Sequence, residues 1–315
     1  MTATAWTRKN LFDLRELSAE EIGLILETAT SFKEISTREV KKVPVLRGKT
    51  IVTLFFEPST RTRTSFELAA KRLSADTINI AASSSSLSKG ESVLDTARNI
   101  EAMNVDMIIV RHASSGVPRI LADNLNSAIV NAGDGCRSHP TQALLDMFTI
   151  KERLGKIKGL NVTIVGDVLH SRVARSNIVG LTKMGANVTL CGPSTLIPPE
   201  IERLGAKVSF DLDAVVPESD VVMALRLQKE RQQEKFLPSI REYVQRFGIT
   251  EERLCRARPE MIVMHPGPTN RGIELSAEVA DGPRSVILDQ VTNGVAVRMA
   301  VLYLLSGASK AKEAV

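Results

Sequence analysis

The feature that most constrains the fold of this chain is an alternation of short apolar runs with helix-like patterns. Nine runs have the length and composition of buried strands, and helical patterns occupy most of the gaps between them. The predicted strands span 50–56, 77–80, 107–110, 127–131, 161–165, 187–190, 207–210, 221–225 and 261–264. Such alternation predicts parallel sheets covered by helices on both faces, which is a doubly wound α/β architecture.

The length of the chain and one break in its pattern predict two domains. The 315 residues are enough for about two domains of ordinary size. A helical pattern over 141–154 is followed by a new strand–helix unit, so we expect one domain over 1–150 and a second over 151–290. We expect the C-terminal helix, 291–315, to pack back on the first domain.

Composition argues against several classes of function. The net charge of 41 − 36 = +5 is spread along the chain and only 4% of residues are aromatic, which argues against nucleic-acid binding. Cys136, Cys191 and Cys255 are far apart and form no CxxC pair, so we expect reduced thiols in a cytoplasmic protein and no bound metal. The N-terminus lacks the apolar core of a signal peptide, and no apolar run approaches membrane-spanning length, so we expect no membrane attachment.

The segment 57–66, Glu-Pro-Ser-Thr-Arg-Thr-Arg-Thr-Ser-Phe, predicts an anion site. It follows the first predicted strand, and helical spacing of apolar residues starts at its end, so we expect Pro58 in the first turn of a helix and Ser59 and Thr60 at its cap. Unpaired N–H groups, hydroxyls and guanidinium groups at one helix N-terminus suit a phosphate. An ordinary capped helix would explain Ser59 or Thr60 alone, but not the alternation of hydroxyls and arginines.

Polar side chains follow six of the predicted strands, at the edge where ligands bind in open α/β sheets. These segments are 57–64, 111–112, 133–142, 166–172, 226–231 and 265–271. The early segments suit a phosphate, and the arginines of the later ones suit carboxylates. The glycines of the G-x-G-x-x-G and Walker motifs are absent, which argues against nicotinamide and ATP binding.

Four motifs, in their order and spacing, are similar to those of the carbamoyltransferases. They are Ser-Thr-Arg-Thr-Arg at 59–63, Ser-Lys-Gly-Glu at 88–91, His-Pro-Thr-Gln at 139–142 and His-Pro-Gly-Pro at 265–268. The resemblance runs from about residue 8 to the C-terminal helix and is strongest to the aspartate-specific branch. The His-Cys-Leu-Pro and Ser-Met-Gly motifs of the ornithine branch are absent, and the arginines of 226–231 suit a dicarboxylate, whereas they would repel cationic ornithine.

The resemblance implies two doubly wound parallel-sheet domains with the active site in the crevice between them. It implies transfer of the carbamoyl group of carbamoyl phosphate to the amino group of L-aspartate. The products would be N-carbamoyl-L-aspartate and phosphate, in de novo pyrimidine (UMP) biosynthesis, and no cofactor is expected. A carbamoyltransferase for another amine acceptor such as ornithine, and a non-catalytic scaffold, are the alternatives.

The resemblance also implies a role for individual residues. Carbamoyl phosphate would be bound by Ser59, Thr60, Arg61, Thr62, Ser86, Arg111, His139, Gln142, Gly267 and Pro268. Arg61, Thr62, Arg111, His139 and Lys89 would be catalytic, with His139 a neutral hydrogen-bond donor. Aspartate would be bound by Lys89, Arg172, Arg226 and Gln228. Glu57 would organise the site by orienting Arg172 or Arg231, and Ser85 or Ser88 could replace Ser86 as the serine ligand.

The family's assembly extends these expectations to more than one chain. The loop 83–91 would complete the active site of a neighbouring subunit in a homotrimer, with Lys89 as its key cation. Regulatory chains or a dihydroorotase could join a larger assembly. The two domains would close over both substrates.

Overall fold

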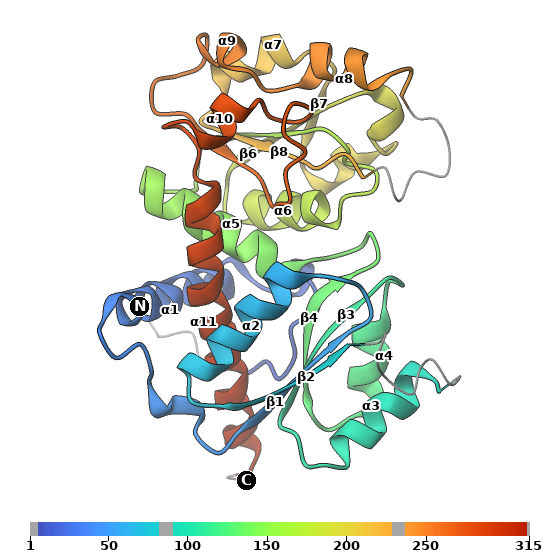
Figure 1. Cartoon of the computed structure of the whole chain (residues 1–315), viewed down its shortest axis with the longest axis vertical. Coiled ribbons are helices and arrows are strands. Elements are labelled where there is room, and N and C mark those ends of the chain that lie inside the picture. The colour runs from blue at the N-terminus through green and yellow to red at the C-terminus, as the bar shows by residue number, and fades with distance from the viewer. Residues whose placement is uncertain (1–5, 82–90, 229–236, 314–315) are drawn as a thin grey trace. The chain divides into compact units, whose positions relative to one another are not determined.

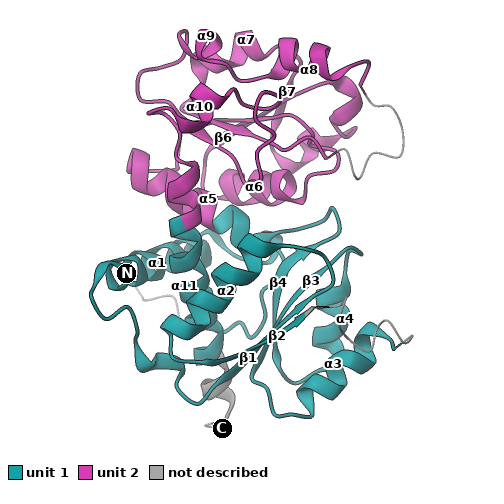
Figure 2. Cartoon of the chain, in the orientation of Figure 1, with its two compact units in different colours: residues 1–144, 292–315 teal, residues 145–291 magenta. Residues whose placement is uncertain are grey.

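A computed structural model of the chain describes residues 6–81, 91–228 and 237–313. It divides into two compact units, residues 1–144 with 292–315 (unit 1) and residues 145–291 (unit 2), as Figure 2 shows. Helices α5 (Pro140–Leu154) and α11 (Ile287–Glu313) each run across a boundary between the units. All nine predicted strands are present, with ends that differ by three residues or fewer, and the doubly wound α/β prediction is confirmed.

Unit 1 is built on a four-stranded parallel sheet with the strand order β2-β1-β3-β4. The strands are β1 (Thr50–Phe55), β2 (Asp76–Ala81), β3 (Met107–His112) and β4 (Ala128–Asp134). Strands β1 and β3 are neighbours although β2 lies between them in the sequence. The strand order therefore reverses between β1 and β3, and such a switch point is where open α/β sheets bind ligands.

Helices cover both faces of this sheet (Figure 1). They are α1 (Ala19–Thr37), α2 (Thr60–Arg72), α3 (Val93–Glu101), α4 (Val117–Asn124) and the unit 1 part of α11. Side chains of α3 and α4 form one buried cluster with Val52, Ile108 and Ile129 of the sheet. On the other face α11 contacts α2, because the Arg298 guanidinium lies 5.0 Å from the centre of the Phe66 ring and donates to Ser65 Oγ at 2.9 Å.

Unit 2 contains a five-stranded parallel sheet with the strand order β7-β6-β5-β8-β9. The strands are β5 (Asn161–Val165), β6 (Asn187–Cys191), β7 (Lys207–Ser209), β8 (Val221–Ala224) and β9 (Ile262–Met264). The helices are α6 (Arg172–Lys183), α7 (Leu212–Val215), α8 (Ile240–Phe247), α9 (Glu251–Leu254) and α10 (Ala277–Asp281). Here the strand order reverses between β5 and β8, which gives this unit its own switch point.

A chain of buried polar groups joins four elements of unit 2. Asp146 of α5 accepts hydrogen bonds from Asn177 Nδ2 of α6 at 2.7 Å and from Gln290 Nε2 of α11 at 2.8 Å. Gln290 Oε1 accepts the His265 N–H at 3.0 Å, directly after β9. All four residues are almost fully buried. Because buried polar groups are costly when unpaired, these hydrogen bonds hold the start of the segment after β9 against three helices.

None of the helices in the described ranges is both long and apolar enough to cross a membrane.

Candidate active site

The switch point of unit 1 brings Glu57 and Arg111 together. Arg111 is paired with Phe55 in the β1–β3 register, and its carbonyl oxygen accepts the Phe56 N–H at 2.9 Å. Its Nε lies 3.4 Å from Glu57 Oε2, and its Nη1 donates to the Ala132 carbonyl oxygen at 3.2 Å. The guanidinium is therefore held between the end of β1 and the end of β4, with only 14% of the side chain exposed.

This pairing gives Glu57 a partner within unit 1. Within unit 1, Glu57 lies next to Arg111, and the implied orientation of Arg172 or Arg231 by Glu57 stays a prediction. Arg172 belongs to unit 2, and Arg231 lies outside the described residues. A carboxylate next to an arginine restricts its rotamers and aligns its donors, so Glu57 positions Arg111.

Helix α2 begins beside the end of β1 with features that suit an anion. Ser59 is its N-cap, and its side chain makes no capping hydrogen bond within the described part of the chain. Pro58 lies before the cap and not in the first turn as predicted, because the helix starts at Thr60. The first turn contains no acidic residue, Arg61 is exposed, and Thr62 is buried. The Ser59 hydroxyl is not used for capping, and the helix N-terminus presents N–H groups and positive charge to one place.

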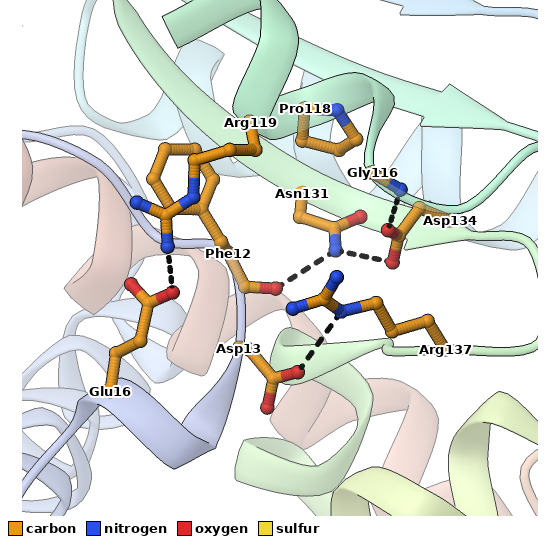
Figure 3. Close-up of a pocket in the computed structure, with 9 residues that line it drawn as sticks. All are labelled: Phe12, Asp13, Glu16, Gly116, Pro118, Arg119, Asn131, Asp134 and Arg137. Carbon is orange, nitrogen blue, oxygen red and sulfur yellow. Dashed lines mark hydrogen bonds and ion pairs between the residues drawn. The ribbon is translucent and has the colours of Figure 1, made fainter. Parts of the chain in front are cut away.

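A pocket of unit 1 close to β4 differs in charge from the α2 site. It is lined by Phe12, Asp13, Glu16, Gly116, Pro118, Arg119, Asn131, Asp134 and Arg137 (Figure 3). Arg119 lies over the Phe12 ring and pairs with Glu16, and Arg137 Nε lies 3.8 Å from Asp13. Two arginines face three carboxylates here, so this pocket lacks the excess positive charge that a phosphate requires.

The acids of this region hold the end of β4 in place. Asp134 accepts hydrogen bonds from Asn131 Nδ2 and from the Gly116 N–H, both at 2.9 Å (Figure 3). The chain continues from Asp134 into α5, where His139 precedes the first turn and Gln142 lies within it. Both side chains are buried, at 4% and 8% exposure.

Unit 1 thus contains the predicted residues Glu57, 59–62, Arg111, His139 and Gln142.

The switch point of unit 2 brings Asp167 next to the segment after β8. Asp167 is completely buried, and its carboxylate accepts the His170 N–H at 3.1 Å and the Gln228 N–H at 3.4 Å. The His170 ring Nδ1 lies 2.9 Å from the same carboxylate. Arg226 and Gln228 both follow β8, so a buried acid holds the backbone of a predicted aspartate-binding segment.

Two further predicted groups lie in unit 2. Arg172 is the first residue of α6 and is 4% exposed, and the Ser171 N-cap hydroxyl accepts the Ala174 N–H. After β9, the Gly267 N–H donates to His265 Nδ1 at 2.8 Å, so that ring nitrogen is an acceptor. The Gly267–Pro268 peptide bond is cis.

Three predicted residues lie outside the described part of the chain, and two buried acids lie close to predicted site segments. Ser86, Lys89 and Arg231, with the alternatives Ser85 and Ser88, lie outside the described residues. The buried acids are Asp167 and Glu274, which sequence reasoning did not assign to the site. Asp167 follows a predicted strand directly, which is a usable signal, whereas Glu274 follows no strand and has no local signal.

No group of three His, Cys, Asp or Glu side chains in the described ranges is arranged to hold a metal ion. The arrangement instead offers arginines, hydroxyls and a helix N-terminus at the two switch points. These groups define the class of the protein: an α/β enzyme that binds small anions.

Comparison with known proteins agrees with this class and narrows it. The profile of the aspartate/ornithine carbamoyltransferase carbamoyl-P binding domain matches residues 9–152, and that of the Asp/Orn binding domain matches residues 158–305. The chain belongs to the aspartate/ornithine carbamoyltransferase family and is a carbamoyltransferase.

Individual relatives indicate which branch of the family the chain is similar to. The aspartate carbamoyltransferase catalytic subunit of Syntrophus aciditrophicus is 60% identical over 304 residues, which is 96% of this chain and 99% of the relative. That of Syntrophobacter fumaroxidans is 61% identical and covers 95% of this chain and 98% of the relative. These similarities are to the aspartate branch.

Solved structures of both branches share the fold. Aspartate transcarbamoylase from Trypanosoma cruzi, in complex with carbamoyl phosphate and aspartate, has a TM-score of 0.85 and 30% identity over 96% of this chain and 97% of its own. Ornithine carbamoyltransferase from Pyrococcus furiosus also has a TM-score of 0.85, with 33% identity over 96% of this chain and 98% of its own. Backbone similarity therefore does not separate the branches, whereas the identities near 60% do.

Proposed function

We propose that the chain transfers the carbamoyl group of carbamoyl phosphate to the amino group of L-aspartate, in pyrimidine biosynthesis. The observation that carries the proposal is the unit 1 switch point, where the Glu57–Arg111 pair lies at the ends of β1 and β3 and α2 begins directly after β1. A dianionic phosphate needs such a combination of N–H groups, hydroxyls and a directed guanidinium. The relatives near 60% identity support aspartate as the acceptor.

Residues of unit 1 would bind and activate carbamoyl phosphate. Ser59, Thr60 and Arg61 would bind the phosphate, which is the leaving group. Thr62, Arg111 and His139 would donate to the carbonyl oxygen, where negative charge develops when the amine attacks the carbonyl carbon. Gln142 would bind the carbamoyl nitrogen together with the carbonyl oxygens of Gly267 and Pro268. Catalysis would then rest on orientation and preorganised charge.

Residues of unit 2 would bind aspartate. Arg172 and Arg226 are suited to the two carboxylates because a guanidinium can donate two parallel hydrogen bonds to one carboxylate. Gln228 would add a neutral donor, and the contact between its N–H and Asp167 holds its backbone. Cationic ornithine would meet two like charges here, so the same geometry argues against the ornithine branch.

The proposal includes a shared active site in a cytoplasmic homotrimer. The loop with Ser86 and Lys89 would come from a neighbouring subunit, and Lys89 would bind aspartate and take part in catalysis. A larger assembly with regulatory chains or a dihydroorotase would be built from such trimers.

A direct assay tests the reaction. Purified chain with carbamoyl phosphate and aspartate should form N-carbamoyl-aspartate and phosphate, and ornithine should not replace aspartate. Arg61→Ala should lower turnover by about 10²–10³-fold, as expected for a lost anion donor. Lys71→Ala, which removes one positive charge from the last turn of the same helix, is the matched control and should keep normal turnover. Activity with ornithine alone, or full activity of Arg61→Ala, would contradict the proposal.

Subunit mixing tests the shared site. Arg61→Ala and Lys89→Ala chains should each be inactive alone, and hybrid trimers should regain part of the activity because some sites would then lack neither residue. Subunit exchange would be verified by mass measurement of tagged chains. Verified exchange without recovered activity would show that Arg61 and Lys89 act within one chain.

A further inference from the structure

Glu274 is a buried carboxylate in the segment between β9 and α10 of unit 2. It is 1% exposed, and its carboxylate accepts three hydrogen bonds. Oε1 accepts the Leu227 N–H and an Asn270 Nδ2–H, both at 2.7 Å, and Oε2 accepts the Asn270 N–H at 2.9 Å. One side chain therefore connects two backbone segments that are more than 40 residues apart in the sequence.

The backbone around Glu274 is itself held by hydrogen bonds. Its carbonyl oxygen accepts the Ile249 N–H at 3.0 Å, and the Gly272 N–H donates to the Leu275 carbonyl oxygen at 2.8 Å. The Ile273 N–H donates to the Asn270 carbonyl oxygen at 3.0 Å. The segment from Asn270 to Leu275 is thus a compact turn, and its carboxylate is presented from a supported position.

The two segments that Glu274 connects are those on which the proposed site of unit 2 depends. Leu227 lies between Arg226 and Gln228, the residues that would bind aspartate. Asn270 lies two residues after Pro268, whose carbonyl oxygen would bind the carbamoyl nitrogen. A shift of either backbone segment would move substrate-binding groups by a similar amount, and such misplacement is costly for catalysis.

We propose that Glu274 is a positioning residue that holds the aspartate-binding segment after β8 and the carbamoyl-binding segment after β9 in one fixed arrangement. The proposal rests on the function proposed above. In this role Glu274 connects the two segments and does not contact substrate.

The chemistry of the group explains why a carboxylate occupies this position. An ionised carboxylate only accepts hydrogen bonds, so both of its oxygens can face N–H donors. A glutamine could serve the two donors at Oε1 but would direct an NH₂ group at the Asn270 N–H. Burying a carboxylate is unfavourable, and these hydrogen bonds must offset that cost. An apolar side chain in this position would carry no such cost, so stability alone does not account for a carboxylate here.

Steady-state kinetics of three variants test the role. Glu274→Gln and Glu274→Ala remove one and all three of the acceptor contacts, and Glu278→Gln, at an exposed position in α10, is the matched control. We expect the KM for aspartate to rise in the order wild type, Glu274→Gln, Glu274→Ala, by about tenfold for the alanine variant, with a lower kcat. The control should match the wild type in both constants.

A second set of measurements separates this role from a purely structural one. Kinetics would be measured at least 20 °C below the melting temperature of each variant, so that the folded fraction is the same. Asn270→Ala, which removes one of the three contacts, should raise the KM for aspartate by a smaller factor and stands in for Glu274→Ala if that chain does not fold.

Each outcome has one meaning. If the wild-type chain forms no N-carbamoyl-aspartate, the proposed function fails. If the wild type is active and the folded Glu274 and Asn270 variants differ from it only in melting temperature, the positioning role is wrong. A graded rise in the KM for aspartate, with the Glu278→Gln control unchanged, supports it.

Discussion

Gly166, directly after β5, is a position in unit 2 where a single added methyl group should be costly. Its φ is +120°, in the region that side-chain-bearing residues rarely adopt. A Cβ added there would lie 2.7 Å from Tyr243 Oη and 3.2 Å from the Leu225 carbonyl oxygen. Gly166 therefore allows a close approach between the end of β5 and the segment after β8.

The size of the effect follows from two separate costs. A positive φ at a residue with a side chain costs about 1–3 kcal/mol. Forcing a methyl group into a packed site costs about 1–3 kcal/mol more. We expect Gly166→Ala to lower the free energy of unfolding by roughly 2–6 kcal/mol. Tyr243→Phe removes the oxygen that the methyl group would meet, so the double variant should recover about 1–2 kcal/mol relative to the sum of the single variants.

Urea unfolding followed by circular dichroism measures these differences. Gly155→Ala is the matched control, because Gly155 has a φ of +74° but nothing lies within 4 Å of its added Cβ. This variant should show only the cost of the backbone conformation. If Gly166→Ala is no worse than Gly155→Ala, or if Tyr243→Phe recovers nothing, the argument from the close approach is refuted.

Four further predictions concern other parts of the chain. Burial raises the pKa of the Cys191 thiol from 9.0 to about 12, so at pH 8 native protein should be alkylated at exposed Cys255 and not at Cys191, and mass spectrometry of labelled peptides would reveal a contrary result. Because the pKa of Cys191 is raised on folding, its contribution to stability is present below pH 9 and is lost as the pH rises toward 12, a trend that Cys191→Ala should remove from the pH dependence of unfolding. Asp146→Asn would turn an NH₂ group toward one of its two amide donors and should cost about 1–3 kcal/mol in urea unfolding, whereas an unchanged midpoint would mean that the network adds little. Ser18→Ala removes the capping box with Glu21 at the start of α1 and should cost about 1 kcal/mol in the same assay, with Ser18→Thr as the variant that keeps most of the cap.

The strands could be predicted because each is a short apolar run, but the C-terminal ends of β3 and β4 could not. Strand β3 continues beyond the predicted Val110 to His112, and β4 continues beyond Asn131 to Asp134. Main-chain pairing extends both strands into polar residues, with His112 paired to Asp134 after a register shift. Apolar periodicity indicates which side chains are buried. It does not predict a polar strand end that stays in the sheet because of its main-chain hydrogen bonds.

The candidate site likewise has parts that the sequence could predict and parts that it could not. The α2 N-terminus could be predicted because its hydroxyls and arginines are adjacent in the sequence. The contact between Glu57 and Arg111 could not, because it depends on β1 and β3 being neighbours in the sheet. Glu274 was out of reach for the same reason, since its partner Leu227 is distant in the sequence. Local patterns identify binding chemistry, and strand order decides which groups meet.

In both units the buried carboxylates have a different task from the arginines and hydroxyls at the strand ends. Asp134, Asp167 and Glu274 are buried, and each carboxylate accepts a main-chain N–H at the end of a strand or in the segment that follows it. A carboxylate suits this task because its two oxygens can serve donors from different segments. Acids committed in this way have part of their charge compensated by N–H dipoles, so they add less repulsion to an anionic substrate than free acids would. The arginines and hydroxyls at the same strand ends can then supply the positive potential that two anionic substrates require, although buried carboxylates support the backbone around them.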